Sequence, residues 1–544
     1  MKNSDKKVKF IVFVLSIIIV ADLIGLFFYM KKKSKEISNE AQTATSAAGT
    51  AGSEQIEEGL SAPEDFLPQN LIIGEKPPVQ DFTDEEGKKV SLSQYETEPL
   101  WIVFWASWCP DCRNQLGQAA EMQKLADKYG VKILLIDRLN PEKESVKAAQ
   151  EELKNLGISF DCIYDQNEYA YKKWGIQEIP TGVVLNKNGC VAGYTSNTIS
   201  MGQAEAMLQN ALYGYDRATF DFIEKKMCGK YGEIYINNKN ETASPSGNDS
   251  LSESMGLMMQ YAAATQNKSL FERLWNTTQN RFEVQGLAAW YVDEDGTKAD
   301  SNALLDDIRI WSALKSADKL WGGYGKSADQ IRNAIYTRCT DKKHNLVSFC
   351  NFSVDSRASD ISMCYLCPEE LNQMANEESE YKTVTQEAQK ILTNAKISDH
   401  FPLYYSSYNY ITQKYSHEDL NTAEALYTIY NLAASGLVEQ DTLNWISDKV
   451  ESGSLGARYH VDGTVVKGYE YHSTALYGLA ALIARQAGDT ETFNKAIQRM
   501  ERYRISDTSS EYNGAFTADA DGYESFDQLI PLLVYAERNK DCVK

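Results

Sequence analysis

Cys109 and Cys112, in the sequence W-C-P-D-C, are the residues whose types and spacing most clearly indicate chemistry. They follow the apolar run 101–106, which is typical of a buried strand, and they open a segment typical of a helix. Unpaired N–H groups and the dipole at a helix N-terminus stabilise an anion, so we expect the pKa of Cys109 to lie below that of a free thiol. The pair is therefore predicted to be a redox-active dithiol; a structural zinc half-site and an inert disulfide are the alternatives.

The segments that follow predict the elements that would position this dithiol. Buried strands are predicted at 132–137 and 181–185, with a helix at 146–156 between them. Pro180 directly precedes the second of these strands. Because only X-Pro bonds adopt the cis form at low cost, we expect a cis peptide bond before Pro180.

The elements W-C-P-D-C and I-P-T resemble the TlpA/ResA-like branch of the thioredoxin superfamily, over roughly residues 65–212. The resemblance implies an α/β thioredoxin-like fold in which Cys109 is the attacking thiol and Cys112 resolves the mixed disulfide. It also implies that Pro180 lies opposite the thiols and holds the backbone of a disulfide-bearing protein client. We expect Trp108, next to Cys109, to contact the client as well.

The composition describes a large acidic chain with more than one domain. It has 544 residues, of which 43% are hydrophobic, enough for two or three sizeable cores. Acidic residues outnumber basic ones by 76 to 55, and no basic run follows the first 35 residues, so we expect no nucleic-acid partner. The ten cysteines are too few for a disulfide scaffold. We expect neither a cofactor nor a bound metal.

An apolar segment at residues 10–30 is long enough to cross a hydrocarbon core of about 30 Å. Lysines flank both of its ends, so charge does not determine its orientation. Its length and the lysines that follow it favour an uncleaved anchor over a cleaved signal peptide. We expect residues 1–33 to be a cytoplasmic tail and transmembrane anchor and residues 34–64 a disordered tether. The folded domains would then lie outside the cytoplasm, at the cell membrane.

After the thioredoxin-like domain, assigned to residues 65–213, the sequence changes to a series of helical segments. Residues 214–250 end in a polar stretch and are predicted to be a connector. No fixed sequence period is visible, which favours a toroid of helical hairpins over a repeat array. Helices are predicted at 252–279, 303–321, 328–339, 368–395, 420–436, 441–451, 470–487, 490–504 and 525–537.

Two segments, 252–262 and 287–314, resemble glycoside hydrolase family 8. The resemblance implies an all-α (α/α)₆ barrel over residues 251–544 that cleaves a β-linked, β-glucan-like polysaccharide with inversion. The expected fold class is therefore multidomain: a transmembrane helix, an α/β thioredoxin-like domain and an all-α barrel.

The same resemblance places Glu253 on the general acid and Asp307 on the second aspartate of the A-T-D-x-D motif. Leu305 stands where the family has the first aspartate, which helps to hold sugar and water. This departure leaves open a barrel without turnover, one that binds carbohydrate or recruits a redox client.

Inverting hydrolysis needs a protonated acid and a carboxylate about 6.5 to 9.5 Å away that activates water. Apolar neighbours predict that burial keeps Glu253 protonated, whereas an N-cap at Ser252 would make Glu253 a mere complement to the helix dipole. The candidate bases are Glu418, Asp419 and Asp355, each also consistent with a helix cap or a solvated loop acid.

Aromatic residues are dense in this half of the chain and are candidates for stacking on sugar rings. Most aromatic residues at helical spacing belong to a core, so we expect only a few, Trp290 and Trp311 foremost, to line a groove. The full set is Trp290, Tyr291, Trp311, Trp321, Tyr404, Tyr405, Tyr408, Tyr410, Tyr469 and Tyr471.

Four further cysteines lie close together in the sequence. Cys339 and Cys350 bracket a hairpin-like segment, and Cys364 and Cys367 form a second C-x-x-C. One interpretation is a four-cysteine zinc site, although such a site usually has two tight C-x-x-C pairs and only one is present here. The alternative is a Cys339–Cys350 disulfide with buried or paired thiols at Cys364 and Cys367. The sequence leaves open the pairing of the remaining cysteines, Cys162, Cys190, Cys228 and Cys542.

Overall fold

The computed structural model describes residues 68–83, 89–140, 142–236, 248–517 and 523–542, which belong to one compact unit. The predicted anchor and tether lie outside the described residues. Within the described ranges, no helix is both long and apolar enough to cross a membrane.

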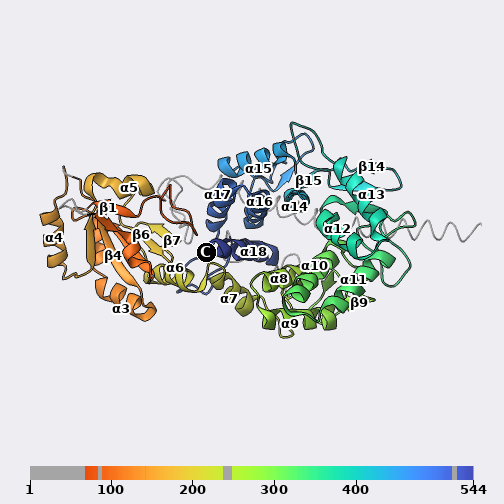
Figure 1. Ribbon diagram of the computed structural model, residues 1–544, viewed down its shortest axis with the longest axis horizontal. Helices are drawn as coiled ribbons and strands as arrows, with labels where there is room; N and C mark the ends of the chain where they lie inside the picture. Colours follow the sequence, from red (N-terminus) through yellow and green to blue (C-terminus); the bar gives the residue numbers. More distant parts are fainter. Residues whose placement is uncertain (1–67, 84–88, 141, 237–247, 518–522, 543–544) are drawn as a thin grey trace, which may run out of the picture. The chain divides into compact units, whose positions relative to one another are not determined.

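A five-stranded sheet forms the core of the N-terminal part (Figure 1). The order is β5–β4–β3–β6–β7, with β3 parallel to β4 and antiparallel to β6. Every residue of the central strand β3 is buried, which explains its continuous apolar sequence. The strands are β3 (Leu100–Trp105), β4 (Lys132–Asp137), β5 (Asp161–Tyr164), β6 (Thr181–Leu185) and β7 (Val191–Ser196). The strands predicted at 132–137 and 181–185 are confirmed.

Helices pack on this sheet and on each other. Helix α6 begins with a capping box between Ser200 and Gln203 and contacts α3, β6 and β7. The helices are α2 (Pro110–Leu116), α3 (Ala119–Tyr129), α4 (Val146–Asn155), α5 (Tyr169–Trp174) and α6 (Met201–Tyr213). A hairpin of β1 (Asp81–Thr83) and β2 (Lys89–Ser91) precedes them, and the 3₁₀ turns are η2 (Leu92–Tyr95) and η3 (Gln166–Glu168).

The C-terminal part is a closed ring of helices surrounded by others (Figure 1). Neighbours in the ring are α8 and α10, α12 and α14, α14 and α16, and α16 and α18, and α18 contacts α8. The 3₁₀ turn η5 (Met363–Tyr365) contacts both α10 and α14. The ring helices are α8 (Ser252–Ala264), α10 (Leu304–Trp321), α12 (Pro368–Glu377), α14 (Thr422–Ala434), α16 (Thr474–Ala487) and α18 (Ser525–Cys542).

The outer helices pack against the ring. Helices α9, α11, α13 and α17 contact the ring helix that precedes each, α15 contacts α16 and α17, and α7 contacts α18. Their bounds are α7 (Arg217–Lys226), α9 (Lys268–Thr277), α11 (Gly325–Arg338), α13 (Tyr381–Thr393), α15 (Gln440–Ser452) and α17 (Thr490–Glu501). The segment predicted as a connector thus contains a packed helix, α7, whose Thr219 hydroxyl donates to the Gly514 carbonyl at 2.8 Å.

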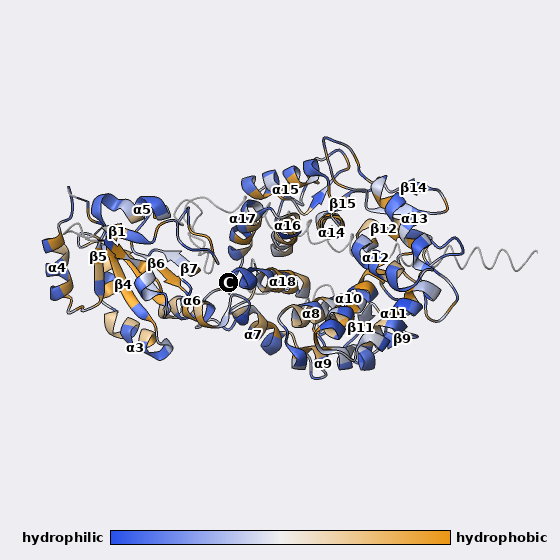
Figure 2. Ribbon diagram, viewed as in Figure 1, coloured by the Kyte–Doolittle hydropathy of each residue, from blue (hydrophilic) through white to orange (hydrophobic). Residues whose placement is uncertain are grey.

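The ring helix α16 is covered on all sides, which explains its largely apolar sequence. All residues from Thr474 to Ala484 in α16 are buried, and Figure 2 shows hydrophobic residues along the sheet strands and the ring helices. Two glycines allow close approach of neighbouring helices. A Cβ at Gly256 on α8 would lie 3.1 Å from Cβ of Arg309 on α10, and one at Gly478 on α16 would lie 2.7 Å from Ile530 on α18.

Short strand pairs hold the N-terminal ends of several ring helices. β8 (Ser250–Leu251) pairs with β11 (Tyr291–Val292) before α8, and β15 (Leu420–Asn421) pairs with β16 (Arg458–Tyr459) before α14. Before α12, β12 (Asp360–Ser362) pairs with β13 (Ser407–Asn409). The other short elements are β9 (Glu283–Val284), β10 (Leu287–Ala288), β14 (Lys414–Tyr415) and the π-turn η4 (Thr278–Phe282).

Candidate functional site

Cys109 is the N-cap of α2, where the sequence predicts it. Its Sγ accepts a hydrogen bond from the backbone N–H of Cys112 at 3.1 Å, and Pro110 occupies the first helical position. The two cysteines form a disulfide. Cys109 is 5% exposed and Cys112 is fully buried, so the first sulfur is the one closer to solvent.

The predicted client-binding residues surround Cys109. The Ile179–Pro180 bond is cis, as predicted, and the Ile179 carbonyl oxygen lies 3.6 Å from the Cys109 Sγ. Trp108 is 37% exposed, and the Nζ of Lys143 lies 5.2 Å from the centre of its ring. A chain approaching Cys109 would therefore meet an exposed aromatic face and a backbone carbonyl.

Buried carboxyl groups lie behind the dithiol. Glu144 accepts hydrogen bonds from the N–H and the hydroxyl of Ser107, at 2.7 and 2.9 Å, which holds the turn before Cys109. Asp137, at the end of β4, is paired in register with Trp105, and both of its carboxyl oxygens are buried without a hydrogen-bond partner. Burial, with the charges of Glu144 and Asp165, raises the pKa of Asp137 to about 8. From the sequence, Asp137 is only the last residue of a predicted strand, and its buried carboxyl group is not predicted.

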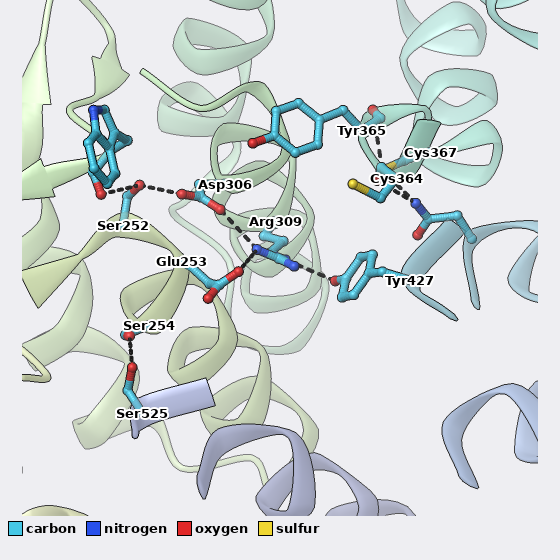
Figure 3. Close-up of polar contacts among 12 residues, drawn as sticks. Ser252, Glu253, Ser254, Asp306, Arg309, Cys364, Tyr365, Cys367, Tyr427 and Ser525 are labelled. Carbon is cyan, nitrogen blue, oxygen red and sulfur yellow. Dashed lines mark hydrogen bonds and ion pairs between the residues drawn. The ribbon is translucent and has the colours of Figure 1, made fainter. Parts of the chain in front are cut away.

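In the helical part, Glu253, Asp306 and Arg309 form an ion-pair cluster (Figure 3). Arg309 Nη1 donates to Glu253 Oε2 at 3.1 Å and to Asp306 Oδ1 at 2.9 Å. Its Nε donates to the Tyr427 hydroxyl at 2.9 Å, and the Ser252 hydroxyl donates to Asp306 Oδ2 at 2.6 Å. The first turn of α8, the first two turns of α10 and the middle of α14 thus contribute side chains to one cluster.

The members of this cluster differ in their access to solvent. The side chains of Arg309 and Asp306 are 3% and 9% exposed, whereas that of Glu253 is 28% exposed. Burial raises the pKa of Asp306 to about 6. The positive charge of Arg309 opposes this rise, and the charge of Glu253 adds to it. The sequence predicts that apolar side chains enclose Glu253, but in the structure its carboxyl group contacts Arg309 and reaches solvent.

A further carboxyl group, Glu424, lies in the first turn of α14. Its side chain is accessible to solvent, yet the surrounding protein and the charge of Glu253 raise its pKa, while Arg458 opposes the rise. Glu424 was missed by the sequence reading. Its signal is an acid in the first turn of an apolar helix, two residues after Thr422, a position similar to that of Glu253 in the first turn of α8.

Asp307 does not join the cluster. Its Oδ1 accepts from the Ala288 N–H at 2.8 Å and its Oδ2 from the Asn302 amide at 2.7 Å, and burial raises its pKa well above the usual range. Adjacent helical residues point about 100° apart, so Asp306 faces Glu253 while Asp307 faces away. Leu305, where the family has an aspartate, is buried.

The other predicted acids have different partners. Asp419 Oδ1 lies 2.6 Å from His460 Nδ1, and Glu418 is exposed. Asp355 is exposed in a loop and lines a pocket with Arg338 and Arg357.

The two foremost aromatic candidates lie in different environments. Trp290 is 44% exposed, and its carbonyl accepts from the N–H of Ser252 at 3.0 Å, which places it beside the cluster. Trp311 is fully buried on α10, so it is a core residue and the prediction that it lines a groove is wrong. Within the described ranges, no group of three or more His, Cys, Asp or Glu residues could hold a metal ion.

Comparison with known proteins agrees with this division of the chain. Residues 73–193 match the AhpC/TSA family. The thiol-disulfide oxidoreductase ResA of Geobacillus thermodenitrificans is 24% identical over 140 residues, which cover 26% of this chain and 78% of ResA. The recognition of a thioredoxin-like domain homologous to thiol–disulfide oxidoreductases is confirmed.

Two further relatives match longer stretches of the chain. The protein named lipoprotein YdaJ of Bacillus subtilis strain 168 is 28% identical over 303 residues, which cover 53% of this chain and 78% of YdaJ. The structure of an α-amylase from Clostridium perfringens is 29% identical with a TM-score of 0.55 and covers 59% of this chain and 96% of that chain.

A family 8 xylanase from Teredinibacter turnerae is a more distant neighbour, 15% identical with a TM-score of 0.47 over 60% of this chain and 92% of that chain. The chain thus joins a thioredoxin-like domain to a helical domain similar in fold to the α-amylase from Clostridium perfringens.

Proposed function

We propose that this chain carries out thiol–disulfide exchange at Cys109 and Cys112 and that its helical domain acts on or binds a carbohydrate. We propose that both domains lie at the outer face of a membrane. The position of Cys109 as the N-cap of α2, with its sulfur accepting the Cys112 N–H, carries the first part of the proposal. In the reduced protein this arrangement favours the thiolate.

The exchange takes place in two balanced steps. The Cys109 thiolate attacks one sulfur of a client disulfide, the client S–S bond breaks, and the other client sulfur leaves as a thiolate. Cys112 then attacks the Cys109 sulfur, which forms the intramolecular disulfide and releases the reduced client. Trp108 and the Ile179 carbonyl contact the client chain while it is bound.

Trapping experiments test this part of the proposal. In Cys112→Ser the second step is lost, so mixed disulfides between Cys109 and envelope proteins accumulate. Cys109→Ser, the matched control, gives none. Equal trapping by both variants would contradict the assignment of Cys109 as the attacking thiol.

For the helical domain we propose hydrolysis of an extracellular or envelope polysaccharide. Glu253 delivers the proton to the leaving oxygen, and Glu424, the solvent-accessible acid on α14, activates water. Arg309, which also donates to the Tyr427 hydroxyl, holds Glu253 in place. The sugar-cleaving relative from Clostridium perfringens and the exposed face of Trp290 beside the cluster support this proposal.

A second function, carbohydrate binding or client recruitment without turnover, is favoured by one observation. Arg309 donates to Glu253 and occupies one oxygen of the carboxyl group that an inverting hydrolase would use to protonate the leaving oxygen.

Reducing-sugar release from β-glucans, xylan and starch separates the two functions. Hydrolysis predicts activity that falls by at least about 100-fold in Glu253→Gln and in Glu424→Gln. Binding without release in the wild-type chain would support the non-catalytic function.

A further inference from the structure

Cys339 and Cys350 lie on opposite sides of one asparagine. The Asn302 amide nitrogen donates to the Cys339 Sγ at 3.2 Å, and its carbonyl oxygen accepts from the Cys350 N–H at 2.7 Å. Asp307 in turn accepts from the same amide nitrogen at 2.7 Å and fixes its orientation. The two thiols are free and hydrogen-bonded to each other, with the Cys339 S–H donating to Cys350.

The two cysteines differ in their surroundings. Cys339, at the end of α11, is fully buried. Cys350 lines a pocket of about 440 Å³ together with Arg338, Arg357 and Asn351. The hydrogen bond from Cys339 and the two guanidinium groups lower the pKa of Cys350 to about 7, whereas the same hydrogen bond and burial raise the pKa of Cys339.

We propose that Cys339 and Cys350 are a second redox pair, and that Cys350 reacts from this pocket with an anionic disulfide of low molecular mass. The pocket has the volume of a small-molecule site. Arg338 and Arg357 outnumber Asp355, the one acid that lines the pocket, and favour a disulfide that carries carboxylates. Cys350 is only 2% exposed, so a small molecule reaches its sulfur more readily than a folded protein does.

The reaction balances as two exchanges. The Cys350 thiolate attacks one sulfur of the small disulfide, whose S–S bond breaks and releases one thiolate. The Cys339 sulfur, after losing its proton to solvent or to the released thiolate, attacks Cys350 and releases the second thiol. The protein dithiol is oxidised by two electrons, and the small disulfide is reduced to two thiols. The new bond ties the end of α11 to the segment at 346–350.

Oxidised glutathione is a suitable probe on the full chain. Because the lowered pKa of Cys350 increases its thiolate fraction at neutral pH, we expect it to form the mixed disulfide on the order of ten times faster than an ordinary thiol. Peptide mass spectrometry of the wild-type chain should then show the Cys339–Cys350 bond. In Cys339→Ser the glutathione adduct should accumulate on Cys350, and in Cys350→Ser none should form on Cys339.

The second C-x-x-C provides a matched control within the same molecule. Cys364 and Cys367 are equally buried, but burial raises the pKa of both thiols, so they should stay reduced. The proposal is overturned if Cys339 and Cys350 react only when the chain is unfolded with urea, or if the adduct forms on Cys339. The wild-type measurement needs no substitution, so misfolding of a variant does not affect the result.

Discussion

Two buried aspartates near the dithiol show how partners decide the state of a single residue. Asp165 accepts hydrogen bonds from the N–H groups of Ala170 and Tyr171, and its pKa rises only to about 6. Asp137 has no such partners, and its pKa rises to about 8. Asp165 is therefore a cap for α5, whereas Asp137 is a buried acid that holds its proton near neutral pH.

Asp137→Asn is expected to change the pH dependence of stability. The folded-state pKa of about 8 exceeds the unfolded value of about 3.9, so the stability that protonated Asp137 contributes is present below pH 4 and is lost as the pH rises through 8. The neutral amide removes this loss and should raise the free energy of unfolding at pH 8 by roughly a few kcal/mol. Urea denaturation at pH 5 and pH 8 measures the difference, with unfolding followed by the protease cleavage of the segment that contains β3 and β4. Asp165→Asn, which weakens a cap, should destabilise the protein at both pH values.

Arg309 is a buried cation whose removal leaves Asp306 without a counter-charge. Arg309→Met should therefore lower the free energy of unfolding of the helical domain by about 3–5 kcal/mol. Arg309→Met combined with Asp306→Asn should recover part of the loss, because no buried charge then remains. Thermal unfolding of the two variants checks this, and an equal loss in both would show that the charge of Asp306 is not the cause.

The sequence located Glu253 but not its partners. A one-residue difference between Asp306 and Asp307 decides which acid faces Glu253. Spacing alone does not show this, because the first half of α10 is buried on all faces. Arg309 was missed for the same reason, although Asp306 and Arg309 are three apart, a spacing at which helical side chains meet. Trp311, which the sequence predicts to line a groove, is a buried core residue.

At the level of elements, the strands and the helix that position the dithiol were predicted well because an apolar strand followed by C-P-x-C has strong local signals. Two long predicted helices are each divided in the structure. Residues 252–279 become α8 and α9 because Gln266 adopts a positive φ of 55° and Asn267 caps α9. Residues 368–395 become α12 and α13 around Glu378, which is extended. Such breaks lack glycine or proline, so local sequence does not reveal them.

Gly256 allows α8 and α10 to approach, and substitution there should loosen the helix pair that carries Glu253 and Arg309. Gly256→Leu should destabilise the helical domain by about 1–3 kcal/mol or more, because the added side chain meets Arg309 Cβ at the contact. Gly256→Ala should have a smaller effect. Its Cβ would lie 3.1 Å from Arg309 Cβ, so the two helices need to separate by only a few tenths of an ångström. Hydrogen exchange of α8 and α10 measures the loosening; similar protection in both variants would contradict the packing assigned to Gly256.

At the scale of the whole molecule, the two-part division was predictable but the closeness of the parts was not. Arg504, buried after α17, donates to the Tyr215 carbonyl at 2.7 Å, and Thr508 donates to Glu205 at 2.7 Å. These residues are about 300 positions apart in sequence, so no local pattern indicates the contacts. The described residues form one compact unit where the sequence predicted a connector between domains.

The proposed placement outside the cytoplasm makes a prediction for the whole chain. A membrane-impermeant thiol reagent added to intact cells should label a single cysteine introduced at the exposed position Ile411, in a chain that retains residues 1–33. Labelling only after the cells are lysed would place the helical domain inside and contradict the proposed orientation.

The most direct test of the central claim is the pH dependence of alkylation of reduced Cys109 in Cys112→Ser. If the end of α2 stabilises the sulfur anion, the rate should rise with a midpoint below that of an ordinary thiol, about 8.5. A midpoint at or above that value would contradict the claim that Cys109 is an activated nucleophile.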